Sequence, residues 1–166
     1  MVEKSGTIFE IILFFCKKLS WMNLIKYPVV ADGHHETYEF LSEGPKGTIK
    51  KVVLYQEIDD GLYNLAFGDW DEKNQRIDDR ARSNNKDMTM VLATVASTVV
   101  DFIKHHPEAM LIGKGSTPGR TRIYQMGIGE NWKEISQLFD VEGFSKTGWE
   151  PFEPGKNYLA FTLKAK

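Results

Sequence analysis

The spacing of hydrophobic residues changes along the chain, from alternation in the first half to helical spacing after residue 86. Residues 36–43 and 62–70 alternate, and residues 48–58 are rich in β-branched and aromatic side chains, as strands are. The turn sequences at residues 44–47 and 59–61 separate these three segments with glycine, proline and aspartate. The first half therefore predicts a three-stranded antiparallel meander.

The second half begins with a predicted long helix over residues 87–106. Hydrophobic side chains recur there every three or four residues: Met88, Val91, Leu92, Val95, Ala96, Val99, Phe102 and Ile103. Asn84 or Asn85 can cap this helix, and Asp87 suits its positive end. Pro107 marks its end.

Shorter elements follow the long helix. Residues 109–112 predict a strand, and a second helix begins near Pro118 and ends at Gly127 and Gly129. Asn131 and Glu134 have the spacing of a capping box, which predicts a third, short helix. Residues 141–144 and 158–163 predict two closing strands, joined by a loop around residues 149–152. The expected fold class is α+β with a mainly antiparallel sheet.

The N-terminal segment differs in character from the rest. Residues 8–15 are strongly apolar, but Glu10 interrupts them, and a membrane-spanning helix needs about 20 apolar residues. Residues 1–21 therefore read as a short amphipathic helix packed on the domain, or as a translated extension upstream of Met22. Residues 22–166 are expected to form one α+β domain.

Composition places the chain among ordinary globular proteins. It has 166 residues, of which 42% are hydrophobic and 27% are charged. The net charge of −2 gives no reason to expect a nucleic acid or a membrane as partner. Cys16 is the sole cysteine and cannot form an internal disulfide, so a reducing compartment, the cytoplasm, is expected.

The strongest candidate site is the strand-to-helix turn at residues 114–122. A helix N-terminus offers unpaired N–H groups and partial positive charge to an anion. The turn adds cations, hydroxyls and a glycine that leaves the backbone open: Lys114, Arg120, Arg122, Ser116, Thr117 and Gly115. It predicts binding of a phosphate-bearing small molecule or of an acidic protein surface. The alternative is a structural turn whose arginines pair with carboxylates such as Asp78 or Glu150.

A second polar group precedes the long helix and contains Arg82, Asn84 and Asn85. If the two turns lie side by side at one edge of the sheet, both helix starts could face one ligand. The alternative is that these residues cap the helix and form an exposed turn.

Metal and catalytic patterns are weak. The histidines occur in two adjacent pairs, His34-His35 and His105-His106, and neighbouring side chains on a strand point to opposite faces. Neither pair has a carboxylate or cysteine at zinc-ligand spacing, so no metal and no cofactor are expected.

Several segments together resemble a family of small bacterial proteins, common in Bacteroidetes, that carries no assigned activity. The resemblance covers most of residues 36–166. It lies in residues 42–47 with 49–51, 63–69, 91–96, 115–118 with 120–122, and 149–152.

The order of elements is also similar to the second part of a GNAT-type N-acetyltransferase. Residues 122–124 are similar to the helix that such enzymes place near coenzyme A. Their pyrophosphate loop, Arg/Gln-x-x-Gly-x-Gly/Ala, is replaced here by residues 82–87, Arg-Ser-Asn-Asn-Lys-Asp. The resemblance implies a GNAT-like topology and an acyltransferase using acyl-coenzyme A, with Tyr124 as its candidate acid.

The sequence thus favours an anion-binding protein with its site at residues 114–122. The acyltransferase is the enzyme alternative. The third is a protein-interaction module, such as a component of a toxin–antitoxin or phage-defence pair, which small size and the lack of a catalytic motif permit.

Overall fold

The structure is a computed structural model that describes residues 24–78, 85–114 and 118–166, without the side chains of Arg120, Ile123 and Tyr124. The predicted N-terminal segment, residues 1–21, lies outside the described residues.

The predicted meander is confirmed as β2 (Thr37–Gly44), β3 (Gly47–Asp59) and β4 (Leu62–Asp71), paired antiparallel in sequence order. Two short strands that the sequence did not predict extend it. β1 (Val30–Ala31) pairs with β2, and β5 (Arg76–Asp78) pairs with the end of β4. Each has three residues or fewer, which is too short for an alternation of hydrophobic and polar residues to show.

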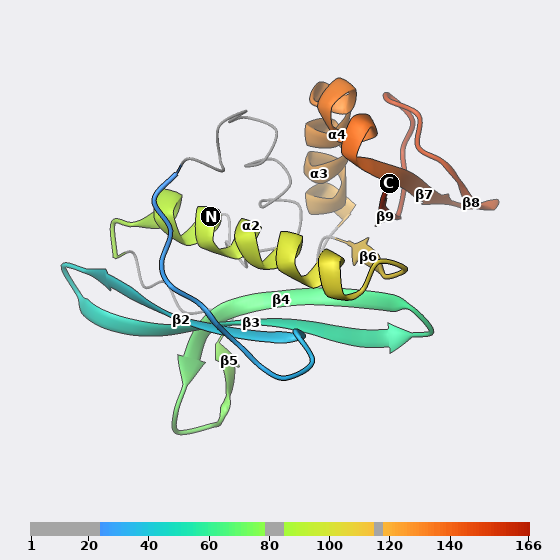
Figure 1. Cartoon of the computed structure of the whole chain (residues 1–166). Helices are drawn as coiled ribbons and strands as arrows, with labels where there is room; N and C mark the ends of the chain where they lie inside the picture. The colour runs from blue at the N-terminus through green and yellow to red at the C-terminus, as the bar shows by residue number, and fades with distance from the viewer. Residues whose placement is uncertain (1–23, 79–84, 115–117) are drawn as a thin grey trace.

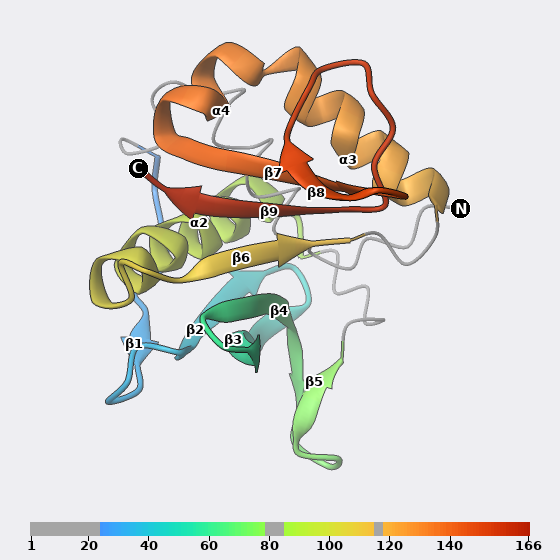
Figure 2. The same ribbon diagram turned by 90° about the vertical axis from the view of Figure 1, so that its right-hand side faces the viewer.

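All the described strands belong to one sheet. Its order is β1-β2-β3-β4, then β6 (Met110–Gly113), β9 (Ala160–Ala165), β7 (Phe139–Ser145) and β8 (Gly148–Pro151), and β5 pairs with β4 beside this path. β6 (Met110–Gly113) runs parallel to the start of β4, and the other described pairs are antiparallel. The expected α+β class with a mainly antiparallel sheet is therefore confirmed. Figures 1 and 2 show α2 (Met88–His105) lying across β2–β4, with α3 (Pro118–Glu130) and α4 (Trp132–Leu138) against the half formed by β9 and β7.

The long helix is confirmed as α2 (Met88–His105), and its apolar stripe faces the sheet. Val95 and Phe102 are fully buried, and the ring of Phe102 stacks on Tyr55 of β3 with centroids 4.0 Å apart. α2 has the length and apolar composition of a membrane span, and one face of it is buried inside the protein.

The start of α2 differs from the prediction. Asn84 lies outside the described residues, and Asn85 does not cap the helix; Asp87 occupies the N-cap position without a side-chain bond to the helix. The Asp87 carboxylate instead accepts hydrogen bonds from the hydroxyls of Tyr27 (2.6 Å) and Ser42 (2.5 Å). Asp87 therefore connects Ser42 of β2, and Tyr27 in the segment before β1, to the helix and does not close the helix end.

The second helix is longer than predicted. α3 (Pro118–Glu130) continues through Gly127 and Gly129, which do not end it. Gly127 and Ile128 are buried, and the O atom of Gly127 accepts bonds from the backbone and the side-chain amide of Asn131, the latter at 2.8 Å. Packing outweighs the low helix propensity of glycine here.

The third helix, α4 (Trp132–Leu138), forms without the predicted capping box. Asn131 holds the N-cap position, but its side chain is directed back to α3 and makes no cap bond. The two helices are thus joined by Asn131 at a tight corner.

The closing part of the sheet contains three strands, where the sequence predicted two. β7 (Phe139–Ser145) and β9 (Ala160–Ala165) match the prediction. The expected loop around residues 149–152 is largely a strand, β8 (Gly148–Pro151), that forms a hairpin with β7. Gly148 has φ of +118°, a conformation open to glycine, and this allows the tight turn after Ser145.

Candidate functional site

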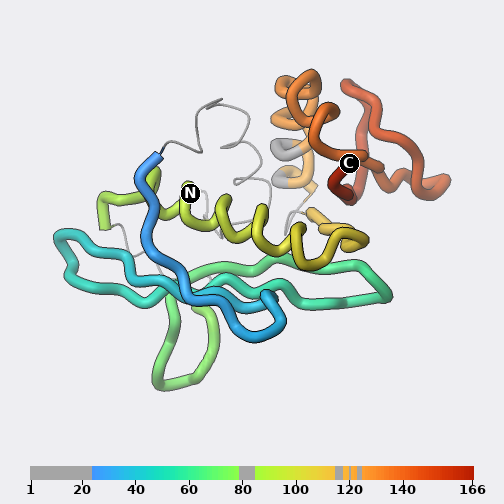
Figure 3. The backbone as a smooth tube through the Cα atoms, in the orientation of Figure 1, coloured from blue at the N-terminus to red at the C-terminus, as the bar shows by residue number. Residues whose placement is uncertain are grey.

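One polar cluster joins a turn of the sheet edge to the last turns of α2. The turn between β1 and β2 is built on Asp32, whose carboxylate accepts the N–H groups of Glu36 (2.9 Å) and Thr37 (3.2 Å). His35 follows in the left-handed region, with φ of +56°. Histidine enters this region more readily than most non-glycine residues, and such residues cluster at functional sites. Figure 3 shows this turn, in blue, next to the C-terminal end of α2.

α2 supplies the other half of the cluster. Asp101 and His105 are four residues apart, so they project from the same helix face. That face meets the β1–β2 turn at the carbonyl end of the helix, where the helix dipole favours positive charge.

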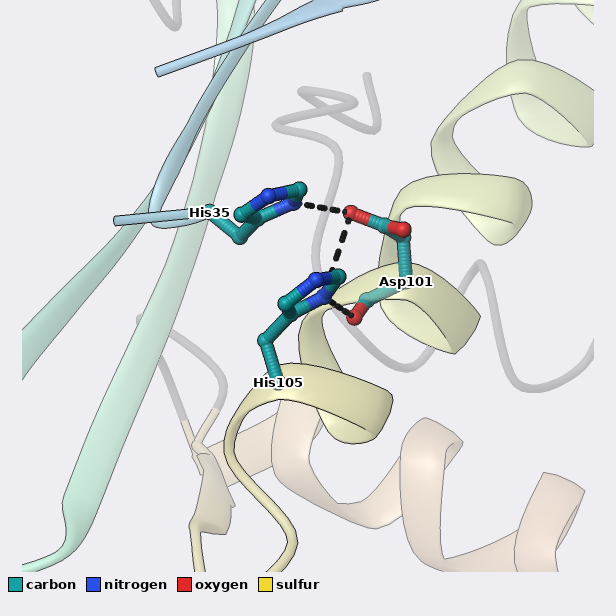
Figure 4. A group of neighbouring side chains, drawn as sticks. All are labelled: His35, Asp101 and His105. Carbon is teal, nitrogen blue, oxygen red and sulfur yellow. Dashed lines mark hydrogen bonds and ion pairs between the residues drawn. The ribbon is translucent and has the colours of Figure 1, made fainter. Parts of the chain in front are cut away.

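The three side chains converge (Figure 4). His35 Nδ1 lies 2.6 Å from Asp101 Oδ2, and His105 Nδ1 lies 3.7 Å from the same oxygen. His105 Nδ1 also lies 2.8 Å from the backbone O of Asp101. The two imidazole rings stack with centroids 3.5 Å apart and planes 10° apart. Both Nδ1 atoms therefore face the Asp101 residue.

Tyr38 of β2 reaches the cluster from the core side. Its hydroxyl lies 2.8 Å from Asp101 Oδ2 and 3.1 Å from the backbone O of His35. Burial of Tyr38, followed by its bond to the Asp101 carboxylate, raises the pKa of its hydroxyl far above the ordinary value. The hydroxyl therefore stays protonated and acts as a donor to the carboxylate.

The cluster is open to solvent on its other side. The side chains of His35, Asp101 and His105 are 31%, 40% and 44% exposed. Partial burial by itself would raise the pKa of the Asp101 carboxyl, but the hydrogen bonds from His35 and Tyr38 outweigh it and lower that pKa. Asp101 is thus a carboxylate at neutral pH, within reach of small solutes.

The remaining histidines have a different role. His106 Nε2 lies 2.9 Å from the backbone O of His34, and the His106 ring stacks on Phe102 with centroids 4.5 Å apart. In each adjacent pair, one histidine belongs to the polar cluster (His35 or His105) and the other does not (His34 or His106).

The cluster has the donor set of a metal site. One ligand atom from each of His35, Asp101 and His105 lies within 4.8 Å of the others. Imidazole nitrogen and carboxylate oxygen are ligands of zinc and related transition metals. Neither adjacent histidine pair reveals this group by itself, because the group takes one histidine from each pair. The spacing Asp101-x-x-x-His105 on a predicted helix was the available signal for half of it.

The predicted anion site is described only in part. Lys114 follows β6 and is exposed, α3 begins at Pro118, and Arg122 is exposed in its first turns. Gly115, Ser116 and Thr117 lie outside the described residues, as does the side chain of Arg120. Glu150, one of the carboxylates considered for these arginines, forms an ion pair with Lys156.

The second polar group is also described in part. Arg82 and Asn84 lie outside the described residues. Asn85 is 3% exposed, and its amide donates to Ser42 Oγ (3.2 Å) and to the backbone O of Gly47 (3.0 Å). Its Oδ1 accepts the N–H of Lys46 at 2.8 Å. The side chain of Asn85 thus supports the β2–β3 hairpin.

Comparison with known proteins gives a family and no activity. No curated protein and no solved structure matches the chain. The family of unknown function DUF6934 matches residues 23–166, which include every described strand and helix and all three residues of the polar cluster. The chain belongs to the DUF6934 family.

Proposed function

We propose that this protein binds a divalent transition-metal ion, of the class of zinc, through His35, Asp101 and His105. The observation that carries the proposal is the convergence of two imidazoles and one carboxylate from two separate elements.

The distances suit a compact ion. Bonds of about 2.0–2.1 Å in a tetrahedral site place neighbouring ligand atoms roughly 3.3 Å apart. The separations of 2.6 Å and 3.7 Å between Asp101 Oδ2 and the two Nδ1 atoms lie on either side of that value. The ion would replace the hydrogen bond between His35 Nδ1 and Asp101 Oδ2, and His105 Nδ1 would turn to it from the backbone O of Asp101. The stacked rings must tilt to direct their lone pairs at one ion, and their exposure leaves room for this movement.

The donor set also favours one class of ion. Neutral imidazole suits zinc, copper, iron and nickel, whereas magnesium and calcium take oxygen ligands. Three protein ligands leave the fourth tetrahedral position free for water or a small ligand, as in catalytic zinc sites.

The test is a titration of the purified protein with Zn²⁺, with Co²⁺ as a visible probe of coordination. Replacing His35 or His105 by Ala should weaken Zn²⁺ binding at least tenfold, because each removes one ligand. The matched control is His34→Ala, since His34 contacts His106 through its backbone O, which the substitution keeps. The proposal fails if the wild type does not bind Zn²⁺, or if His34→Ala and His35→Ala weaken binding equally.

A second candidate function is anion binding at the strand-to-helix turn of residues 114–122. It is favoured by two exposed cations, Lys114 and Arg122, on either side of the start of α3, whose first turn carries no acidic residue. Its ligand would be a phosphate-bearing small molecule or an acidic protein surface. The acyltransferase with acyl-coenzyme A, and the protein-interaction module, stay hypotheses from the sequence.

A further inference from the structure

We infer that Tyr38 is the positioning residue of the metal site, holding the Asp101 carboxylate in place for the ion. This inference rests on the proposed metal binding.

Tyr38 is placed to serve both halves of the site. Its side chain is completely buried, and its ring packs edge-on against Tyr55 with centroids 5.8 Å apart. Its hydroxyl emerges from this packing at the floor of the cluster, 2.8 Å from Asp101 Oδ2 on α2 and 3.1 Å from the backbone O of His35 in the turn. A rigid core side chain thus contacts both segments that carry the ligands.

The bond gains importance when an ion binds. In the structure, Asp101 Oδ2 accepts bonds from both His35 Nδ1 and the Tyr38 hydroxyl. Coordination of His35 Nδ1 to an ion removes the first of these bonds, because the nitrogen lone pair then faces the metal. The Tyr38 bond is left to fix the rotation of the carboxylate. Ligating carboxylates are commonly held by such outer hydrogen bonds, whose loss typically costs 10–100-fold in metal affinity.

A purely structural role for the Tyr38 hydroxyl predicts a different result. It would stabilise the fold by linking β2 to α2, and its removal would lower the melting temperature without a selective effect on the ion. Tyr55 provides the comparison, because its buried hydroxyl lies 3.0 Å from Thr98 Oγ1 on the same helix. Tyr55 also faces α2 but has no contact with a proposed ligand among its described bonds.

The experiment compares Tyr38→Phe with Tyr55→Phe in the full chain. Both keep the ring and remove one buried hydroxyl. Zn²⁺ affinity is measured by competition with a chelating dye, and the melting temperature is measured without metal. Tyr38→Phe should weaken Zn²⁺ binding about tenfold or more, whereas Tyr55→Phe should change it less than about twofold.

A double-mutant cycle tests whether Tyr38 acts through Asp101. In an Asp101→Ala background, Tyr38→Phe should lower the remaining Zn²⁺ affinity much less than it does in the wild type, because the carboxylate is gone and only the contact with the backbone O of His35 is left to lose. Equal loss of affinity in the two tyrosine variants, or full affinity in Tyr38→Phe, would overturn the inference while wild-type binding still supports the metal site. Lack of Zn²⁺ binding by the wild type would overturn the proposed function itself.

Discussion

The imidazole rings of His35 and His105 stack face to face, 3.5 Å apart between centroids, although one belongs to a turn at the sheet edge and the other to the end of α2. The Asp101 residue lies beside both rings and faces their Nδ1 atoms. Two protonated imidazoles so close would repel one another, whereas an ion bound between them and the carboxylate would satisfy all three groups.

The first prediction is that zinc stabilises the protein. An ion that binds the folded state alone raises its stability by about 2.7 kcal/mol at a free concentration one hundred times Kd. The melting temperature of the wild type should therefore rise with added Zn²⁺ and return to its starting value with a chelator. His105→Ala, which binds at least tenfold more weakly, should keep at most about half of that stabilisation at the same Zn²⁺ concentration, and differential scanning fluorimetry across a Zn²⁺ series measures both. A similar rise in the variant would mean that the ion binds elsewhere.

The second prediction concerns acid. Asp101 has a folded-state pKa below its ordinary value of 3.8, so it stabilises the fold above that pH and loses this contribution as pH falls through its lower folded pKa. Asp101→Asn should therefore lower the free energy of unfolding at pH 7 by about 1 kcal/mol, a modest value because the side chain is exposed.

The difference between Asp101→Asn and the wild type should shrink when urea unfolding is repeated below pH 3.8. A difference that stays constant from pH 7 into that range would show that the charge of Asp101 does not contribute to stability.

Some elements of the fold could be predicted from the sequence and others could not, and the difference has physical reasons. α2 was predictable because its apolar stripe is long and its period is unambiguous, and the meander because its turns carry glycine at suitable positions. Gly127 misled the prediction because local propensity suggested a helix end, whereas burial and the bonds from Asn131 hold the helix together. Two of the three residues of the cluster, Asp101 and His105, could be predicted to lie together because they are four residues apart on a predicted helix. His35 joins them only through the pairing of β1 with β2, which no local pattern reveals.

The third prediction tests whether Asn85 is a structural residue. Its buried amide bonds to Ser42, Gly47 and Lys46, and Gly44 lies so close that an added Cβ would overlap the Asn85 backbone. Asn85→Ala should lower the free energy of unfolding by about 2–4 kcal/mol, because it leaves buried polar groups without partners. The control is Asn64→Ala, at an exposed position of β4, which should change it by less than about 0.5 kcal/mol. Equal stability of the two variants in chemical denaturation would leave Asn85 free to serve as a ligand.

The fourth prediction uses two glycines with opposite surroundings. A Cβ on Gly129 would meet Pro154 at 3.8 Å, an ordinary contact, so Gly129→Ala should stabilise α3 by roughly 0.5–1 kcal/mol. A Cβ on Gly143 would lie less than 3.0 Å from the ring of Tyr158, so Gly143→Ala should destabilise the protein by about 1–3 kcal/mol. Thermal unfolding of both variants checks the signs, and a stabilised Gly143→Ala would mean that the β7 strand packs differently.

The last prediction concerns the strand-to-helix turn. If Lys114 and Arg122 serve an anion, inorganic phosphate should bind at low ionic strength and weaken as salt rises, because exposed charges are screened. Arg122→Ala should cost about 1.5–3 kcal/mol of that binding, the usual value of a charged hydrogen bond, with little effect on melting temperature. Arg76→Ala, at an exposed position of β5, removes the same charge from another place and should leave phosphate binding unchanged.

Isothermal titration with phosphate distinguishes these outcomes. If the two variants lose phosphate affinity equally, the effect comes from net charge alone. If the wild type does not bind phosphate and Arg122→Ala lowers the melting temperature, the arginine is a structural residue of α3.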